Sequence, residues 1–274
     1  MANQLNDNEK NRLDGITKRY HDYDMQQATA STYLFITQSI SELISATPSL
    51  QESYDISTKP QFILSAENLT IGNSVSYTEF EPDGTMKMIG SASVYEDFAF
   101  PLLSGKLIGT SDPTLYAIPP YDCAFKVYGY QFAMNNQISG SSELLHGYKE
   151  GSDIEVHIHW TSPSSDDNDK GVKWQFQYAI ASPYSFFYGY TTTVDVVIPA
   201  MSLVFQHFKN IFDDKISGLD NSGNKFRIGT KIMWVLTRIP TACSGGDPNI
   251  DPIGIAVGLH YECDTIGSRL MYLK

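Results

Sequence analysis

The stretch HGYKEGSDIEVHIHWTSP, residues 146–163, carries the pattern that decides the fold. Apolar residues at positions 154, 156, 158 and 160 alternate with Glu155, His157 and His159. A period of two residues is typical of a β-strand with one buried face, because successive side chains point to opposite sides. The apolar side predicts core, with Trp160 as its largest member. The two histidines share the other side.

The same alternation recurs through the second half of the chain. Strands are expected at 154–160, 173–180, 192–198, 226–238 and 255–263. Trp174 and Tyr261 fall on the apolar sides of two of these strands, so both are expected to be structural core residues. Many short strands joined by Gly-, Pro-, Ser- and Asp-rich connections are typical of an all-β protein. We therefore predict a jelly-roll-like β-sandwich over residues 76–274.

A hairpin is predicted near the start of this body. Residues 76–80 and 85–89 form two short alternating segments. Between them, Glu81-Pro82-Asp83-Gly84 places Pro and Gly in the order that a tight turn favours.

Two other segments predict helices instead of strands. Residues 200–212 carry Leu203, Val204, Phe208 and Ile211 at helical spacing, which predicts one helix between the strands. Residues 1–75 are expected to form a separate, partly helical N-terminal arm. One apolar helix face in this arm consists of Leu34, Phe35, Ile36, Ile40, Leu43 and Ile44. That face could pack on its own domain or dock on a partner protein, and the residues leave both alternatives open.

The composition disfavours several classes of partner. The formal net charge is -12, which repels the phosphates of a nucleic acid. No apolar stretch approaches the ~18 residues that a membrane-spanning helix needs. Neither a nucleic acid nor a membrane is therefore expected as a partner. Cys123, Cys243 and Cys263 lie far apart without CxxC spacing, so we expect free and mostly buried thiols instead of a disulfide framework or a zinc ribbon.

The histidines are the candidate residues for a metal-binding or catalytic site. His157 and His159 share one face of their strand, and a neighbouring strand could bring His260 and Glu262 onto the same face. Three histidines and a carboxylate could bind zinc, nickel or iron. The alternative, which the residues favour, is that these side chains make hydrogen bonds within the sandwich or at a subunit contact. No nucleotide, zinc-protease or hydrolase motif is present. We therefore assign no catalytic, cofactor-binding or metal residue and no cofactor.

Three stretches together resemble a widespread family of tailed-bacteriophage and prophage proteins. They are EFEPDGTMKMIGSASVYEDFAFPL at 79–102, HGYKEGSDIEVHIHWTS at 146–162 with VKWQFQYAIA at 172–181, and GLHYECDTIGSRLMYLK at 258–274. The resemblance covers roughly residues 79–274 in the right order. Tyr95-Glu96-Asp97 stands where the family commonly has Trp-Asp-Asp, and Val156 replaces a frequent Pro. These departures leave the expected fold unchanged.

The resemblance implies a virion structural component, of the kind called head fibre, head decoration or tail-fibre-like protein. It implies a homotrimer of β-sandwiches that contacts capsid, portal, neck or tail proteins after assembly in the host cytoplasm, and it implies no enzyme. The N-terminal arm is the expected virion anchor, through Leu34, Phe35, Ile40, Leu43 and Ile44. Two other functions remain open: a receptor-binding fibre module that recognises a host-surface glycan, and a cupin-like metal enzyme that uses His157, His159 and His260.

Overall fold

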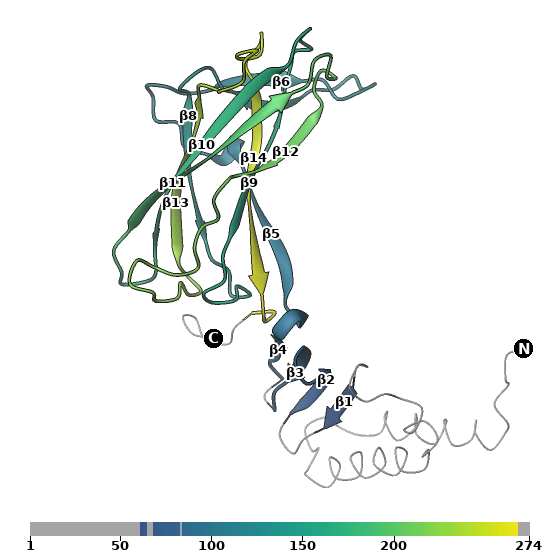
Figure 1. Cartoon of the computed structure of the whole chain (residues 1–274), viewed down its shortest axis with the longest axis vertical. Coiled ribbons are helices and arrows are strands. Elements are labelled where there is room, and N and C mark those ends of the chain that lie inside the picture. Colours follow the sequence, from purple (N-terminus) through teal and green to yellow (C-terminus); the bar gives the residue numbers. More distant parts are fainter. Residues whose placement is uncertain (1–60, 65–67, 83, 268–274) are drawn as a thin grey trace, which may run out of the picture. The chain divides into compact units, whose positions relative to one another are not determined.

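The computed structural model describes residues 61–64, 68–82 and 84–267 (Figure 1). These residues form strands and connections, with two short 3-10 turns at Gly90–Ala92 and Leu102–Ser104. The strands at the start of the described region are β1 Gln61–Leu64, β2 Leu69–Gly72, β3 Tyr77–Phe80 and β4 Met86–Ile89. The later strands are β5 Val94–Pro101, β6 Thr114–Ile118, β7 Val127–Gln131, β8 Gln137–Glu143, β9 Glu155–Thr161, β10 Lys170–Ala181, β11 Tyr188–Ile198, β12 His207–Ile211, β13 Lys231–Ile239 and β14 Ile253–Cys263.

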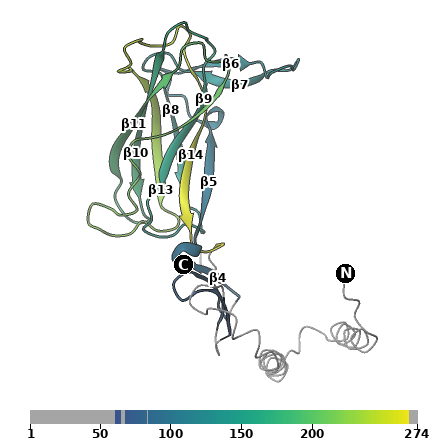
Figure 2. The same cartoon turned by 45° about the vertical axis from the view of Figure 1, so that its right-hand side comes forward.

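The later strands form a β-sandwich of two antiparallel sheets that face each other (Figures 1 and 2). One sheet has the order β8-β13-β10-β11, and the other has β5-β14-β9-β12. From β8 to β14 the chain crosses between the sheets at every connection except that between β10 and β11, which pair within one sheet. This connectivity is that of a jelly roll, so the predicted jelly-roll-like β-sandwich is confirmed. The β6–β7 hairpin extends the second sheet beside the first residues of β14.

β1 to β4 form a separate antiparallel sheet in the order of the chain. The predicted hairpin is present between β3 and β4, where Gly84 has φ +83° and donates a hydrogen bond to the carbonyl of Glu81 at 2.8 Å. The expected boundary between arm and body, at residue 75, lies in the connection between β2 and β3, which pair with each other. The compact unit that contains the described residues begins at Pro60. The predicted arm helices and their anchoring residues lie outside the described residues.

Aromatic side chains fill the space between the two sheets. Trp160, Trp174 and Trp234 are buried, as the alternation predicts for the first two. Phe132 packs edge-on against Trp174 at 5.2 Å between ring centroids, and Trp160 lies 6.1 Å from Trp174. Tyr261 is also buried, which agrees with its expected place on the apolar side of its strand.

The predicted helix over residues 200–212 is wrong. The chain runs through turns to Gln206 and then forms β12, which pairs with β9. Phe208 lies opposite Trp160 and stacks on it at 4.6 Å, while Lys209 faces the other side. The backbone N–H and C=O groups at the edge of β9 need hydrogen-bond partners. The hydrogen bonds that this segment forms with them stabilise a strand more than the helical spacing of its apolar residues would stabilise a helix.

Two smaller expectations need correction. The strand predicted at 226–238 begins only at Lys231, because the preceding residues belong to a connection. Cys123, Cys243 and Cys263 form no disulfide with one another, as expected, but only Cys263 is buried and Cys123 is exposed. Among the residues that the structure describes, no helix has the length and apolar character to span a membrane.

Replacing Trp160 with Ala should lower the free energy of unfolding by about 3–5 kcal/mol, because the indole is 0% exposed and a cavity would remain between the sheets. The indole Nε1–H also donates to Asn210 Oδ1 at 2.8 Å. The measurement is urea unfolding followed by fluorescence. Phe186→Ala is the matched control, since Phe186 is 83% exposed. Equal losses in the two variants would contradict the assignment of Trp160 to the core.

Candidate functional site

The outer face of the second sheet gathers polar side chains from four strands. The register of β14 places His260 opposite Asp97 of β5 on one side and opposite Glu155 of β9 on the other. His157 of β9 lies opposite Gly258 in the same way. Residues directly opposite each other in an antiparallel pair project from the same face. The alternation that buries Trp160 therefore directs these side chains away from the core.

Asp97, His157 and His260 form a compact triad on this face. The Nε2 atom of His260 lies 3.2 Å from Asp97 Oδ2, and the Nε2 atom of His157 lies 3.4 Å from the same oxygen. The His157 and His260 rings are 4.9 Å apart between centroids. One donor atom from each of the three residues falls within 4.8 Å of the others. A single carboxylate oxygen thus faces two imidazole nitrogens.

His157 is the buried member of the triad. Its side chain is 0% exposed, yet neither ring nitrogen makes a hydrogen bond within the described part of the chain. The ring occupies space that a side chain at position 258 would fill, because a Cβ there would stand 2.1 Å from His157 Nε2. Gly258 is therefore the residue that allows His157 to lie across β14 towards Asp97.

The surroundings of His157 favour its neutral form. Burial lowers the pKa of His157 to about 4, and the positive charge of Lys209 and the other histidines act in the same direction. The carboxylate of Asp97 raises the pKa but does not compensate for burial. At neutral pH the ring is uncharged, so one of its nitrogens carries a free lone pair.

A second histidine pair adjoins the triad. His159 Nδ1 lies 2.9 Å from His207 Nε2, and the two rings stack 5.1 Å apart. The pKa of His159 is lowered by burial and then by the neighbouring His207. Lys209 of β12 lies opposite His159, and its Nζ atom is 4.0 Å from Asp97 Oδ2 of the triad. The lysine is the nearest cation to the carboxylate among the described residues.

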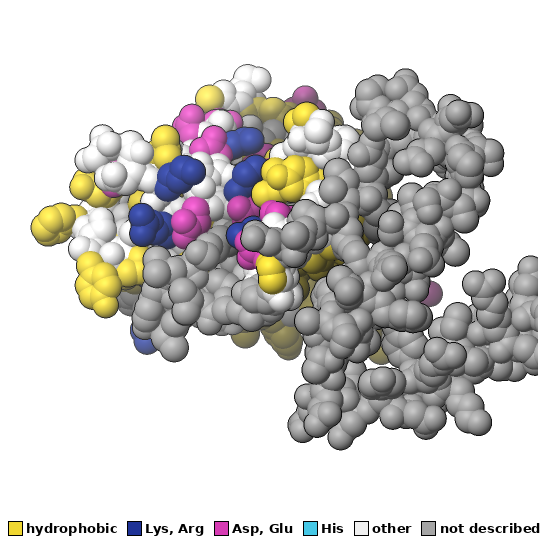
Figure 3. Space-filling view, turned by 90° about the horizontal axis from the view of Figure 1, so that it is seen from below, with side chains coloured by type: hydrophobic (Ala, Val, Ile, Leu, Met, Phe, Trp, Pro, Cys, Tyr) yellow, Lys and Arg dark blue, Asp and Glu magenta, His cyan; other side chains and the backbone are white. Residues whose placement is uncertain are grey.

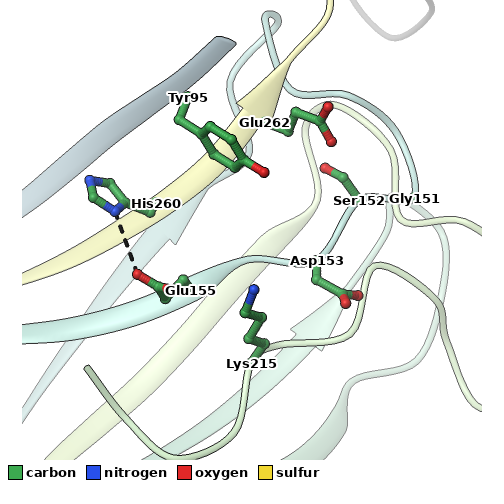
Figure 4. A pocket seen from close by; sticks show the side chains of 8 residues that line it. All are labelled: Tyr95, Gly151, Ser152, Asp153, Glu155, Lys215, His260 and Glu262. Atoms are coloured by element: carbon green, nitrogen blue, oxygen red, sulfur yellow. Dashed lines mark ion pairs between the residues drawn. The ribbon is translucent and has the colours of Figure 1, made fainter. Parts of the chain in front are cut away.

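A groove with a volume of about 690 Å³ opens beside the triad (Figure 4). The side chains that line it are mostly polar and include an ion pair between His260 Nδ1 and Glu155 Oε1, 3.6 Å apart. Its lining consists of Tyr95, Gly151, Ser152, Asp153, Glu155, Lys215, His260 and Glu262. His260 and Glu155 therefore belong both to the polar face around the triad and to the groove.

The structure brings together all three histidines that the sequence singles out, because the ring of His157 lies 4.9 Å from those of both His159 and His260. His157 and His260 converge on Asp97, whereas His159 turns to His207. Glu262, expected beside His260, instead accepts hydrogen bonds from Lys149 and Ser93.

The carboxylate of the triad was not predicted from the sequence. Asp97 stands in the Tyr95-Glu96-Asp97 segment, which marked the family resemblance but not a site. Its role depends on the pairing of β5 with β14, which no local sequence signal predicts. The only local signal for this site was an acidic residue, Asp97, within a short strand.

Comparison with known proteins gives no family assignment: no family model and no curated protein matches the sequence. Among solved structures, a chain from the structure of the infectious bursal disease virus Gx strain aligns with 77% of this chain at 10% identity and a TM-score of 0.28. The aligned part is 45% of that chain. A structure of carbohydrate-binding modules from the β-sandwich superfamily aligns with 76% of this chain and 74% of its own at 8% identity and a TM-score of 0.24. At these identities and TM-scores, neither match identifies a function.

Replacing Gly258 with Ala should displace His157 and lower the free energy of unfolding by about 1–3 kcal/mol, the usual cost of overpacking. The new Cβ would also stand 2.9 Å from Asp97 Oδ1, so two groups must move. The measurement is urea unfolding of the full chain. Gly189→Ala in β11 is the control, because the nearest atom to its Cβ is 4.0 Å away. If the two variants unfold at the same urea concentration, His157 does not depend on the glycine.

Proposed function

We propose that this protein is a non-enzymatic structural component of a bacteriophage virion. In this proposal three copies associate through their sandwich bodies, and the N-terminal arms attach them to a capsid, portal, neck or tail protein. The protein would be assembled in the host cytoplasm and carried in the particle. Multivalent attachment through three arms would strengthen individually weak contacts.

The observation that supports this proposal is the way in which the three phage-like stretches meet. Tyr261 of the last stretch donates a hydrogen bond to Glu96 of the first at 3.1 Å. Lys149 of the middle stretch forms an ion pair with Glu262 at 2.7 Å. The first and last stretches also join where the Met88 N–H donates to the Asp264 carbonyl at 2.7 Å. The resemblance therefore concerns residues that contact one another and hold one body together, as a structural role requires.

The surface is compatible with an assembly of several proteins. Figure 3 shows Lys and Arg interspersed with Asp and Glu on one face, with hydrophobic side chains at its edge. Tyr184, Phe186 and Phe187, in the connection between β10 and β11, expose large aromatic surfaces. Exposed aromatic side chains of this kind are enriched where proteins bind one another. The net charge of -12 helps the free protein to remain dissolved before assembly.

Deleting residues 1–48 should leave a trimeric body that no longer joins phage particles. Light scattering measures the oligomeric state, and mass spectrometry of purified particles measures incorporation when each chain complements a phage that lacks its own copy. A full-length variant with Leu34, Phe35, Ile40, Leu43 and Ile44 replaced by Ser keeps the chain length and should also fail to join. A monomeric body would contradict the trimer, and unchanged incorporation would contradict the anchor.

A second candidate function is recognition of a host-surface glycan, which the groove beside the triad favours. Tyr95 is 74% exposed at its rim, next to the side chains of Asp153, Lys215 and Glu262. An aromatic face beside convergent polar groups provides apolar contact and hydrogen bonds for a sugar ring.

Tyr95→Ala should weaken binding to a host polysaccharide at least about tenfold if the loss of the ring costs 1.4 kcal/mol or more, as aromatic hot spots commonly do. A glycan array followed by calorimetry measures this binding. Phe186→Ala, which removes an exposed aromatic side chain outside the groove, is the control. Absence of binding to all polysaccharides of the host would contradict this second function.

A further inference from the structure

The donor set of the triad is that of a transition-metal site. Two imidazole nitrogens and one carboxylate oxygen, from His157, His260 and Asp97, are ligands that zinc accepts readily. The three residues come from three adjacent strands, β9, β14 and β5, so the sheet holds their spacing. Ligands carried by paired strands are better fixed than ligands carried by loops.

Two distances within the triad fit a shared ion. Bonds of about 2.0–2.1 Å in a tetrahedral arrangement place two donor atoms about 3.3 Å apart. The separations from Asp97 Oδ2 to His260 Nε2 and His157 Nε2 are 3.2 and 3.4 Å. The His157 contact does not have the alignment of a hydrogen bond, because the Nε2 atom has no hydrogen-bond partner among the described residues. The spacing of this nitrogen and this oxygen is that of two ligands of one ion.

The burial of His157 is the second, independent observation. A fully buried imidazole without a hydrogen bond loses interactions with water and regains none, which is costly. Coordination through Nε2 would satisfy one of its nitrogens. Gly258 leaves the room that brings this nitrogen to the carboxylate.

The outer partners of the triad support the same arrangement. Glu155 Oε1 lies 3.6 Å from His260 Nδ1, on the side of the ring opposite the triad. A carboxylate that accepts a hydrogen bond from the second ring nitrogen orients a ligating histidine and increases its basicity, and Glu155 is the carboxylate placed beside this nitrogen. Lys209 is the cation beside Asp97, and its side chain is 38% exposed, so it can turn towards solvent when a doubly charged ion binds. The side chains of Asp97 and His260 are 35% and 32% exposed, which leaves access from solvent.

We propose that Asp97, His157 and His260 bind one Zn²⁺ ion that clamps β5 and β9 to β14, with Glu155 as the residue that positions His260. This set differs from the three histidines that the sequence alone offers, because Asp97 replaces His159. The ion has a structural role: it joins three segments that lie far apart in the chain and stabilises the folded body by binding to it. The site does not require the virion function and is tested separately from it.

The test is calorimetric titration of the full-length chain with Zn²⁺ after dialysis against a chelator, with thermal unfolding before and after addition. One Zn²⁺ per chain and a higher Tm are expected. Glu155→Gln removes an outer partner and should weaken Zn²⁺ binding by about 10- to 100-fold. Asp97→Asn and His260→Gln remove ligands and should weaken Zn²⁺ binding by more than about 100-fold. His146→Gln, a histidine outside the triad and the second pair, should bind Zn²⁺ like the wild type.

Several results would overturn the proposal. The wild type could bind no Zn²⁺ at micromolar concentration, or binding could survive in Asp97→Asn and His260→Gln. Binding lost in His159→Gln or His207→Gln, but kept in Asp97→Asn, would place the ion at the second pair instead. His157→Gln is the most direct variant but changes a buried residue. The two partly exposed ligands therefore decide the outcome if that variant does not fold.

Discussion

The backbone pairing of β14 with β5 on one side and β9 on the other is the constraint on which the rest of the structure depends. The paired segments are distant in the sequence, so their pairing must overcome the entropy of closing long loops. Burial of an aromatic core on one face of the sheet offsets that cost. The ion pair of Lys149 with Glu262 and the hydrogen bond from Tyr261 to Glu96 lie at the same junction and hold its register.

That register determines both faces of the sheet at once. Trp160 points between the sheets, and its neighbours His157 and His159 point outwards, so a slip of one residue would exchange the core with the polar face. The irregularity between Gly254 and Ala256 sets which residues of β14 oppose the histidines. Gly258 then provides the space in which His157 reaches Asp97. The triad is thus a product of the same pairing that builds the core.

Local alternation was sufficient to predict five of the ten later strands, β9, β10, β11, β13 and β14, together with the jelly-roll class and the burial of Trp160, Trp174 and Tyr261. It failed at residues 200–212, where apolar residues at helical spacing lie in turns and in β12. The segment pairs with the open edge of β9, and a sheet edge provides backbone partners that sequence spacing does not reveal. The hairpin at Gly84 was predictable because turn chemistry is local.

By itself, the sequence determined which side chains share a strand face, because that depends only on the period of the backbone. This placed His157 beside His159, and His260 on a polar face of its own strand. Only the tertiary structure decided that His157 and His260 meet Asp97, while His159 meets His207. The physical reason is that contacts between strands depend on pairing and register, which result from the packing of the whole core and not from any single segment.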